Sequence, residues 1–241
     1  MQKRLDVYLS ENNTVKSRSL AASLIKQGSV EVNGRICTKA SFAVDENDNI
    51  RIIGEMPKYV GRGGLKLEKA LSHYRLHLDG SVCIDIGAST GGFTDCMLQN
   101  GAVKVYSVDV GTDQLDEKLR NDPRVVSMEK TDIRNCVGTL PTVDFIGIDV
   151  SFISLKLILP SAYALLKDGG ECVALIKPQF EAGKSHLSKH GIVRDSKVHK
   201  KVCDDISEFP SPLGFERGEV ISSPITGGDG NTEYLIYLRR L

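Results

Sequence analysis

The chain has 241 residues, of which 41% are hydrophobic and 26% are charged, and its formal net charge is zero. This composition is that of a globular protein with ample material for a core. No apolar run reaches the roughly 18–20 residues that cross a bilayer, and the first residues, MQKRLDVYLSENN, lack the apolar region of a signal peptide. We therefore expect a cytoplasmic protein without a membrane segment.

The six cysteines are scattered, with no CxxC pair and none beside a histidine at metal-ligand spacing. We expect reduced thiols, mostly in the core, and no metal site. Charge is uneven along the chain: residues 1–66 hold 11 Lys and Arg against 7 Asp and Glu, and the remaining 175 residues hold 20 against 24. The excess of basic residues in 1–66 favours contact with a polyanion, although a solvated surface gives the same charge pattern.

The first 53 residues predict a compact unit. A short amphipathic helix is expected around Leu5–Leu9, and a second runs from its cap Ser17 to about Gln27, where Gly28 ends it. The run SVEVNGRIC predicts two short strands around an Asn-Gly turn, and a strand at 49–53 closes the unit.

This stretch resembles the small RNA-binding domain first named from the fourth protein of the small ribosomal subunit. The matching features are RLDVYL, the SRS-x-A-x-x-L-I-x-x-G-x-V-x-V-N-G run and a closing D-x-I-x-I. The resemblance implies that basic side chains bind structured RNA by charge and shape, with a solvated helix face as the alternative. The expected RNA-binding residues are Lys3, Arg4, Lys16, Arg18, Lys26, Arg35 and Arg62.

The chain after this stretch predicts a linker and a larger α/β domain. We assign 1–54 to the small domain, 55–64 to a Gly- and Pro-punctuated linker, and 65–241 to the second domain, which opens with a helix at 65–74. Strands are expected at 82–86, 104–109, 124–128, 144–149, 171–177, 217–222 and 233–239, and helices near 92–100, 112–120, 154–167 and 196–208. Such alternation implies a mostly parallel sheet covered on both faces.

The last two strands are joined by SSPITGGDGNTEY without a helix, so they are expected to form an antiparallel hairpin. A mostly parallel sheet that ends in such a hairpin is the layout of the Rossmann-like methyltransferases that use S-adenosylmethionine (SAM). The predicted fold class is therefore this α/β fold, preceded by a small α+β RNA-binding domain.

A glycine-rich turn, in VCIDIGASTGGFTD, follows the first strand of the sheet. In an open α/β sheet the ligand sits beside this turn, at the carboxyl ends of the strands. Asp85 ends the strand, and its carboxylate suits the ammonium group of SAM better than a pyrophosphate. Asp109 lies where an acidic residue binds ribose hydroxyls in such folds. Asp132 follows the third strand, within reach of an adenine amino group. The expected SAM-binding residues are Asp85, Gly87, Ser89, Gly91, Gly92, Phe93, Asp109 and Asp132. The alternatives are an NAD-binding fold, from whose GxGxxG the spacing GxxxGG departs, and helix-capping aspartates on an unrelated α/β protein.

Four charged residues fall at one edge of the predicted sheet. Asp149 in DFIGIDVSFISL lies where a methyl acceptor binds, Lys177 ends the next strand, Glu233 begins the last strand, and Lys66 lies early in the linker helix. The Asn/Asp-Pro-Pro-Tyr/Phe motif of base-amine methylation is missing, as is the cysteine nucleophile of cytosine carbon methylation. An ordinary salt bridge is the alternative for each residue alone.

The order Lys66, Asp149, Lys177, Glu233 resembles the tetrad of the FtsJ-type ribose 2′-O-methyltransferases. Nearly the whole chain is similar to the TlyA family of haemolysin-named rRNA 2′-O-methyltransferases, in YVGRGGLKL, DIGASTGGFTD, DVSFISL, LIKPQFE, HGIVRD and SSPITGGDGNTEY. Gly61 departs from the serine common in relatives.

The resemblance implies methyl transfer from SAM to a 2′-hydroxyl, of cytidine, in ribosomal RNA or ribosomal subunits. Lys177 is expected to take or steer the hydroxyl proton. We expect a monomer with no obligate protein partner. A membrane-lytic protein and an RNA-binding ribosome factor with an inactive methyltransferase body remain as alternatives. Phe152, Phe180 and Tyr234 are expected near the same edge, either stacking on a splayed nucleotide or as core.

Overall fold

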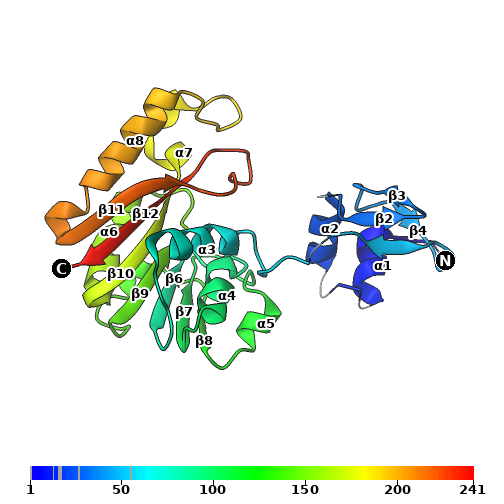
Figure 1. The fold of residues 1–241 in the computed structure, drawn as a ribbon, viewed down its shortest axis with the longest axis horizontal. Coiled ribbons are helices and arrows are strands. Elements are labelled where there is room, and N and C mark those ends of the chain that lie inside the picture. Colours follow the sequence, from blue (N-terminus) through cyan, green and yellow to red (C-terminus); the bar gives the residue numbers. More distant parts are fainter. Residues whose placement is uncertain (1, 13, 16–17, 27, 55) are drawn as a thin grey trace. The chain divides into compact units, whose positions relative to one another are not determined.

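The computed structural model describes residues 2–12, 14–15, 18–26, 28–54 and 56–241 (Figure 1). The chain divides into two compact units, Met1–Met56 and Pro57–Leu241. The division falls two residues after the expected end of the small domain, so most of the expected linker belongs to the larger unit. Within the described residues, no helix is long and apolar enough to span a membrane.

The small unit packs two helices against short antiparallel strands. Its described elements are β1 (Lys3–Arg4), α1 (Leu5–Glu11), α2 (Arg18–Lys26), β2 (Val30–Val32), β3 (Arg35–Ile36), β4 (Ala43–Val44) and β5 (Ile50–Ile52). The strands pair in the orders β3-β2-β5 and β1-β4. Leu5 and Leu9 of α1 and Leu24 and Ile25 of α2 are buried in one cluster with Val30, which gives this unit a hydrophobic core of its own.

The predicted Asn-Gly hairpin is confirmed. Asn33 and Gly34, between β2 and β3, have φ of 53° and 78°, the left-handed backbone that this turn requires. The pair β1–β4 was not predicted, because two-residue strands are too short to show an alternating pattern. The expected helix cap Ser17 lies outside the described residues.

Residues 57–241, all of them described, form a seven-stranded sheet with helices. The strands are β6 (Val82–Ile86), β7 (Lys104–Val108), β8 (Val125–Met128), β9 (Val143–Ile148), β10 (Leu166–Ile176), β11 (Phe215–Ser222) and β12 (Tyr234–Arg240). The helices are α3 (Gly63–Tyr74), α4 (Gly92–Gln99), α5 (Glu117–Arg120), α6 (Leu155–Leu165), α7 (Pro178–Glu181) and α8 (Ser196–Glu208), with 3-10 turns η1 (Ile133–Asn135), η2 (Lys184–His186) and η3 (Ser211–Leu213).

The strand order of this sheet is β11-β12-β10-β9-β6-β7-β8. β12 runs antiparallel to both of its neighbours, β10 and β11, while β10, β9, β6, β7 and β8 are parallel to one another. The predicted fold, a mostly parallel sheet with a C-terminal antiparallel hairpin, is confirmed.

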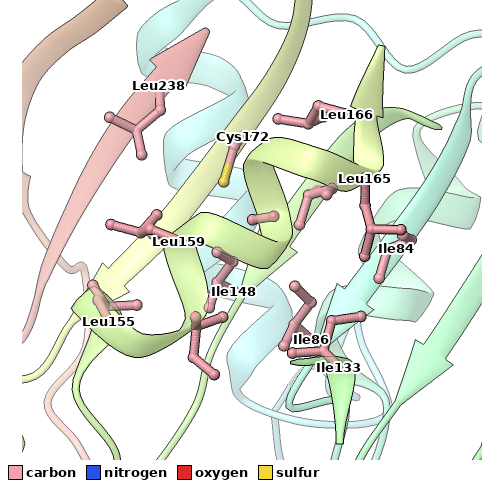
Figure 2. Close-up of a cluster of buried hydrophobic side chains, with 14 of the residues drawn as sticks. Ile84, Ile86, Ile133, Ile148, Leu155, Leu159, Leu165, Leu166, Cys172 and Leu238 are labelled. Carbon is pink, nitrogen blue, oxygen red and sulfur yellow. The ribbon is translucent and has the colours of Figure 1, made fainter. Parts of the chain in front are cut away.

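Both faces of the sheet are buried. Figure 2 shows one face, where Ile84 and Ile86 of β6 lie in a cluster with Leu155 and Leu159 of α6. Cys83, which directly precedes Ile84, belongs to the opposite cluster, with side chains of α3, α4 and α5. Alternate residues of a strand point to opposite faces, so near-continuous apolar strands are what a sheet covered on both sides needs.

One predicted helix is much shorter than expected. Of the predicted helix 112–120, only α5 forms. The side chain of Glu129 accepts hydrogen bonds from the backbone N–H groups of Asp113, Gln114 and Leu115, at 2.8, 3.0 and 3.3 Å. These bonds hold the preceding residues in a loop. β10 begins earlier than expected, at Leu166, where the predicted helix 154–167 has already ended.

Candidate active site

A cavity of about 310 Å³ opens where β6, β9 and β10 end and β12 begins. α3, the glycine turn after β6, the segments that follow β9 and β10, and the loop that precedes β12 all contribute to its walls. This is the edge at which open α/β sheets bind their ligands. The cavity is lined by Arg62, Gly63, Lys66, Gly87, Ala88, Ser89, Thr90, Gly92, Phe93, Asp149, Ser151, Phe152, Lys177, Gln179, Phe180, Ile225, Gly227, Gly228, Asp229 and Glu233.

The four residues predicted as a catalytic set meet in this cavity. Lys66 Nζ lies 2.7 Å from Glu233 Oε2 and 3.5 Å from Asp149 Oδ2. Lys177 Nζ lies 2.6 Å from Asp149 Oδ1. Asp149 therefore stands between two ammonium groups, and the order of contacts is Glu233, Lys66, Asp149, Lys177.

The set is nearly buried and balanced in charge. The side chains of Lys66, Asp149, Lys177 and Glu233 are 9%, 16%, 9% and 3% exposed. Two buried lysines and two buried carboxylates can stay charged only because each has an opposite partner in contact.

Lys177 makes its directed hydrogen bond with a residue that the sequence analysis missed. Its Nζ donates to Ser151 Oγ at 2.9 Å, whereas its contact with Asp149 Oδ1 is an ion pair without hydrogen-bond geometry. Gln179, also missed, lines the cavity with a buried Oε1 that has no hydrogen-bond partner among the described residues. Both residues lie within two positions of a predicted residue, in DVSF and IKPQ, which is the signal that marks them.

The glycine turn is shaped by close backbone approaches. Gly87 and Gly91 have φ of 86° and 94°, and a Cβ on Gly87 would lie 2.5 Å from the carbonyl oxygen of Asp149. Gly91 faces the side chains of Leu115 and Leu119 and does not line the cavity. The predicted residues Gly87, Ser89, Gly92 and Phe93 do line it.

Asp85 lies behind the turn and not on the cavity wall. It is fully buried, and its Oδ2 accepts hydrogen bonds from the N–H and the Oγ1 of Thr94, at 2.8 and 2.7 Å. Burial raises its pKa from 3.8 to about 7, and its Oδ1 has no hydrogen-bond partner among the described residues. In this structure the carboxyl braces the start of α4 and offers no surface to a ligand.

The other two acids at strand ends also lie outside the lining. Asp109 accepts hydrogen bonds from the N–H groups of Ser89 and Gly111, at 2.8 and 2.7 Å, and so holds the glycine turn from the side of β7. Asp132 pairs with Arg134 at 2.6 Å, and this hydrogen-bonded guanidinium lowers the pKa of Asp132.

Three of the predicted RNA-binding cations are paired within the small unit. Arg4 and Arg18 lie 2.9 and 3.0 Å from the carboxylate oxygens of Asp6, and Lys3 lies 2.6 Å from Glu11. Asp6 is buried. The hydrogen bond from Arg4 is the largest cause of its lowered pKa, and with Arg18 it brings that pKa to about 2.

The remaining predicted cations differ in their surroundings. Lys26 and Arg35 are exposed, and Arg62 lines the cavity of the larger unit. Lys16 lies outside the described residues.

Two of the three expected aromatic residues lie together at the cavity. The rings of Phe152 and Phe180 are 4.9 Å apart, and Phe152 is 90% exposed with a φ of 65°. Tyr234 does not join them: its hydroxyl pairs with His199 Nδ1 at 3.1 Å and it lines a different cavity. Tyr234 follows the core alternative and packs against the hydrophobic cluster of one sheet face, because it directly follows Glu233 and neighbouring strand residues point to opposite faces.

Comparison with known proteins identifies the family. The profile of the FtsJ-like methyltransferases matches residues 59–240, and that of the S4 domain matches residues 3–50. YqxC of Bacillus subtilis is 47% identical over 98% of this chain and 85% of its own length. The 16S/23S rRNA (cytidine-2′-O)-methyltransferase TlyA of Mycobacterium tuberculosis is 37% identical over 98% of this chain and 89% of its own length.

A solved structure supports the same relationship. A haemolysin-named protein from Streptococcus thermophilus superimposes with a TM-score of 0.78 and 46% identity, covering 99% of this chain and 88% of that one. From its sheet order, its four-residue cluster and these matches, the chain belongs to the FtsJ-like methyltransferase family and carries an S4 domain at its N-terminus.

Proposed function

We propose that this protein transfers a methyl group from SAM to the 2′-hydroxyl of a cytidine in ribosomal RNA, in the cytoplasm. The observation that carries the proposal is the contact of Lys66, Asp149, Lys177 and Glu233 beside the glycine turn. The names of relatives such as TlyA supply the nucleoside and the RNA. The S4 domain supports an RNA substrate and leaves the stoichiometry of the complex open.

The residues of the cavity fit SAM. Gly87, Ala88 and Ser89 line one wall with backbone and very small side chains, which leaves room for a ligand close to the chain. The unpartnered Gln179 Oε1 is a buried acceptor, which is costly unless a donor such as an ammonium or hydroxyl group satisfies it. When bound, SAM supplies a methyl group already activated by its sulfonium.

The remaining chemistry falls to this chain. A ribose hydroxyl is a weak nucleophile, so it must be held in line with the methyl group and lose its proton. Lys177 Nζ accepts that proton as the hydroxyl oxygen bonds to the methyl carbon, a step that requires the lysine as its neutral amine, and Asp149 and Ser151 fix the position of the nitrogen. Lys66, held by Glu233, fixes the other carboxylate oxygen of Asp149. Phe152 and Phe180 offer rings on which an unstacked nucleotide can lie.

The test is methyl transfer from labelled SAM to purified 30S and 50S subunits, with nuclease mapping of the product. Lys177→Ala is expected to lower the rate by about 10²–10⁴-fold, the usual contribution of a general base. Lys167→Ala is the matched control, because Lys167 joins the other ends of the same two strands through an exposed ion pair with Asp144 at 2.6 Å. Label in an alkali-resistant dinucleotide supports the proposal, and label on a base contradicts it.

A further inference from the structure

A second cavity, of about 510 Å³, lies along α8, β11 and β12. Its polar lining includes two cations, Arg194 and Lys200, and the hydroxyl groups of Ser196, Ser222, Thr232 and Tyr234. None of its lining residues is Asp or Glu, although residues 67–241 hold 24 acidic against 20 basic residues. Two carboxylates stand beside this lining, Asp204 in an ion pair with Lys200 and Asp195 at the start of α8, but neither lines the cavity.

Both cations are available to a ligand. Arg194 is exposed and makes no ion pair with any described residue. Among the residues that the structure describes, Lys200 pairs with Asp204 alone, and the two side chains are 78% and 53% exposed. An exposed pair of this kind contributes little and can exchange for another anion. Ser196 begins the 13-residue helix α8, whose N-terminus is capped by Asp195, which accepts a hydrogen bond from Lys197 N–H at 2.8 Å, so the ligand contacts of the cavity are side chains.

The cavity is joined to the candidate active site through one short segment. Thr232 and Tyr234 line the second cavity, and Glu233 between them lines the first. Asn231, which is 2% exposed, accepts a hydrogen bond from Val193 N–H at 3.1 Å, next to Arg194. Its carbonyl oxygen accepts from Gly227 N–H at 2.9 Å, and Gly227 lines the active site.

We propose that this second cavity binds a phosphodiester group of the RNA strand that carries the reacting ribose, at a site separate from the methylated position. Two exposed cations and the hydroxyl groups of Ser196, Ser222 and Thr232 match a phosphate, and the hydrogen bonds of Asn231 connect that contact to the loop beside Glu233. The identity of the strand rests on the proposed function. A free phosphate has the same chemistry, and the experiments below separate the two sources.

The first experiment compares two pairs of charge removals in the full-length protein. Arg194→Gln with Lys200→Gln removes the cations of the cavity, and Lys197→Gln with Lys201→Gln removes two exposed cations of α8 that do not line it. Binding of a ribosomal RNA fragment is measured at several salt concentrations. The cavity pair is expected to weaken binding at least about tenfold and to lower the salt slope by about 0.7–0.9, the value for one lost phosphate contact. Equal losses in both pairs, or no loss, overturn the proposal.

The second experiment uses Cys203, which lines the cavity, as a reporter of occupancy. Burial raises its pKa to about 11, so alkylation is slow enough to follow by mass spectrometry. In a Cys37→Ser background, the RNA fragment is expected to slow alkylation of Cys203, and millimolar inorganic phosphate is expected to do so much less. Full protection by phosphate with none by RNA assigns the cavity to a free anion and overturns the proposal.

Methyl transfer by the wild-type protein is measured in parallel, and it distinguishes failure of the second site from failure of the proposed reaction. Wild-type transfer to a 2′-hydroxyl with unchanged RNA binding by the Arg194→Gln, Lys200→Gln variant rejects the second site alone. RNA binding that depends on those two residues, without any methyl transfer, rejects the proposed reaction and retains the site.

Discussion

Lys177 is held by two groups of different chemistry. The carboxylate of Asp149 attracts its charge, and the hydroxyl of Ser151 accepts its directed hydrogen bond. A carboxylate alone leaves the ammonium free to rotate around it, whereas the added hydroxyl selects one position. Ser151 is therefore a positioning residue that acts through Lys177.

Loss of this hydroxyl has a measurable consequence. Ser151→Ala is expected to lower kcat about tenfold, equivalent to about 1.4 kcal/mol, with little change in SAM affinity. Ser151→Thr keeps the hydroxyl and is expected to retain most of the activity. Single-turnover methyl transfer together with SAM titration makes the comparison. Equal losses in both variants would show that packing, and not the hydrogen bond, matters at this position.

Asp85 makes stability depend on pH in an unusual direction. Its pKa rises from 3.8 to about 7 on burial, so between these values the folded chain binds more protons than the unfolded chain. The free energy of unfolding then falls as pH rises from about 4 to about 7, by at most about 1.4 kcal/mol per pH unit from this group.

Asp85→Asn removes the titration and is expected to remove this slope. Urea unfolding of the wild type and the variant at pH 5, 6, 7 and 8, followed by circular dichroism, gives the difference in slope directly. A parallel pH dependence in the two proteins would count against a buried neutral carboxyl at this position.

At the scale of elements, the glycine turn and the segment after β9 form one unit. Gly87 approaches the Asp149 backbone so closely that a methyl group at that position has no space. A side chain there displaces Asp149, and with it the contact to both lysines.

Gly87→Ala is therefore expected to abolish detectable methyl transfer. Gly80→Ala is the control: Gly80 also has a positive φ, of 73°, but nothing lies within 4 Å of its Cβ position. Both variants are expected to lose about 1 kcal/mol from backbone strain. Only Gly87→Ala is expected to lose activity, which thermal melts and methyl-transfer assays on the same preparations would reveal.

The elements that could be predicted from the sequence are those with a periodic signal. Apolar strands such as β6 and the amphipathic helix α8 match their predicted ranges because burial dictates their patterns. α5 is shorter than predicted because the carboxylate of Glu129, which lies outside the helix in sequence, accepts hydrogen bonds from backbone N–H groups of the residues that precede α5.

The candidate site also contains residues whose place the sequence pattern predicts and residues whose surroundings it does not. Lys66, Asp149, Lys177 and Glu233 could be placed because parallel strands end at one edge of a sheet. The burial of Asp85 and the pairing of Asp132 with Arg134 depend on depth and on local partners, which strand position alone does not specify. For Tyr234 the sequence left stacking and core as alternatives, and the alternation of strand residues decides for the core.

At the scale of the whole molecule, each unit has a core of its own. The cluster around Leu5 and Leu24 shares no residue with the clusters that flank the large sheet. Removal of residues 1–56 is therefore expected to leave a folded larger unit that binds SAM within about twofold of the full chain, because one intact core suffices for a domain. Affinity for ribosomal RNA is expected to fall at least about tenfold, measured by filter binding. Loss of SAM binding on truncation would show that the units depend on each other.

The last strand of the chain occupies an interior position in the sheet. β12 inserts between β10 and β11, and the residue just before it, Glu233, completes the charged cluster. During synthesis the site therefore stays incomplete until the final segment emerges and fits between strands made earlier. A nascent or C-terminally clipped chain without Glu233 and β12 has two unpaired strand edges and a Lys66 paired with Asp149 alone, so it is prone to aggregate and unable to act. For an enzyme proposed to modify ribosomal RNA, competence then requires that β12 has been synthesised and has paired with both of its neighbours.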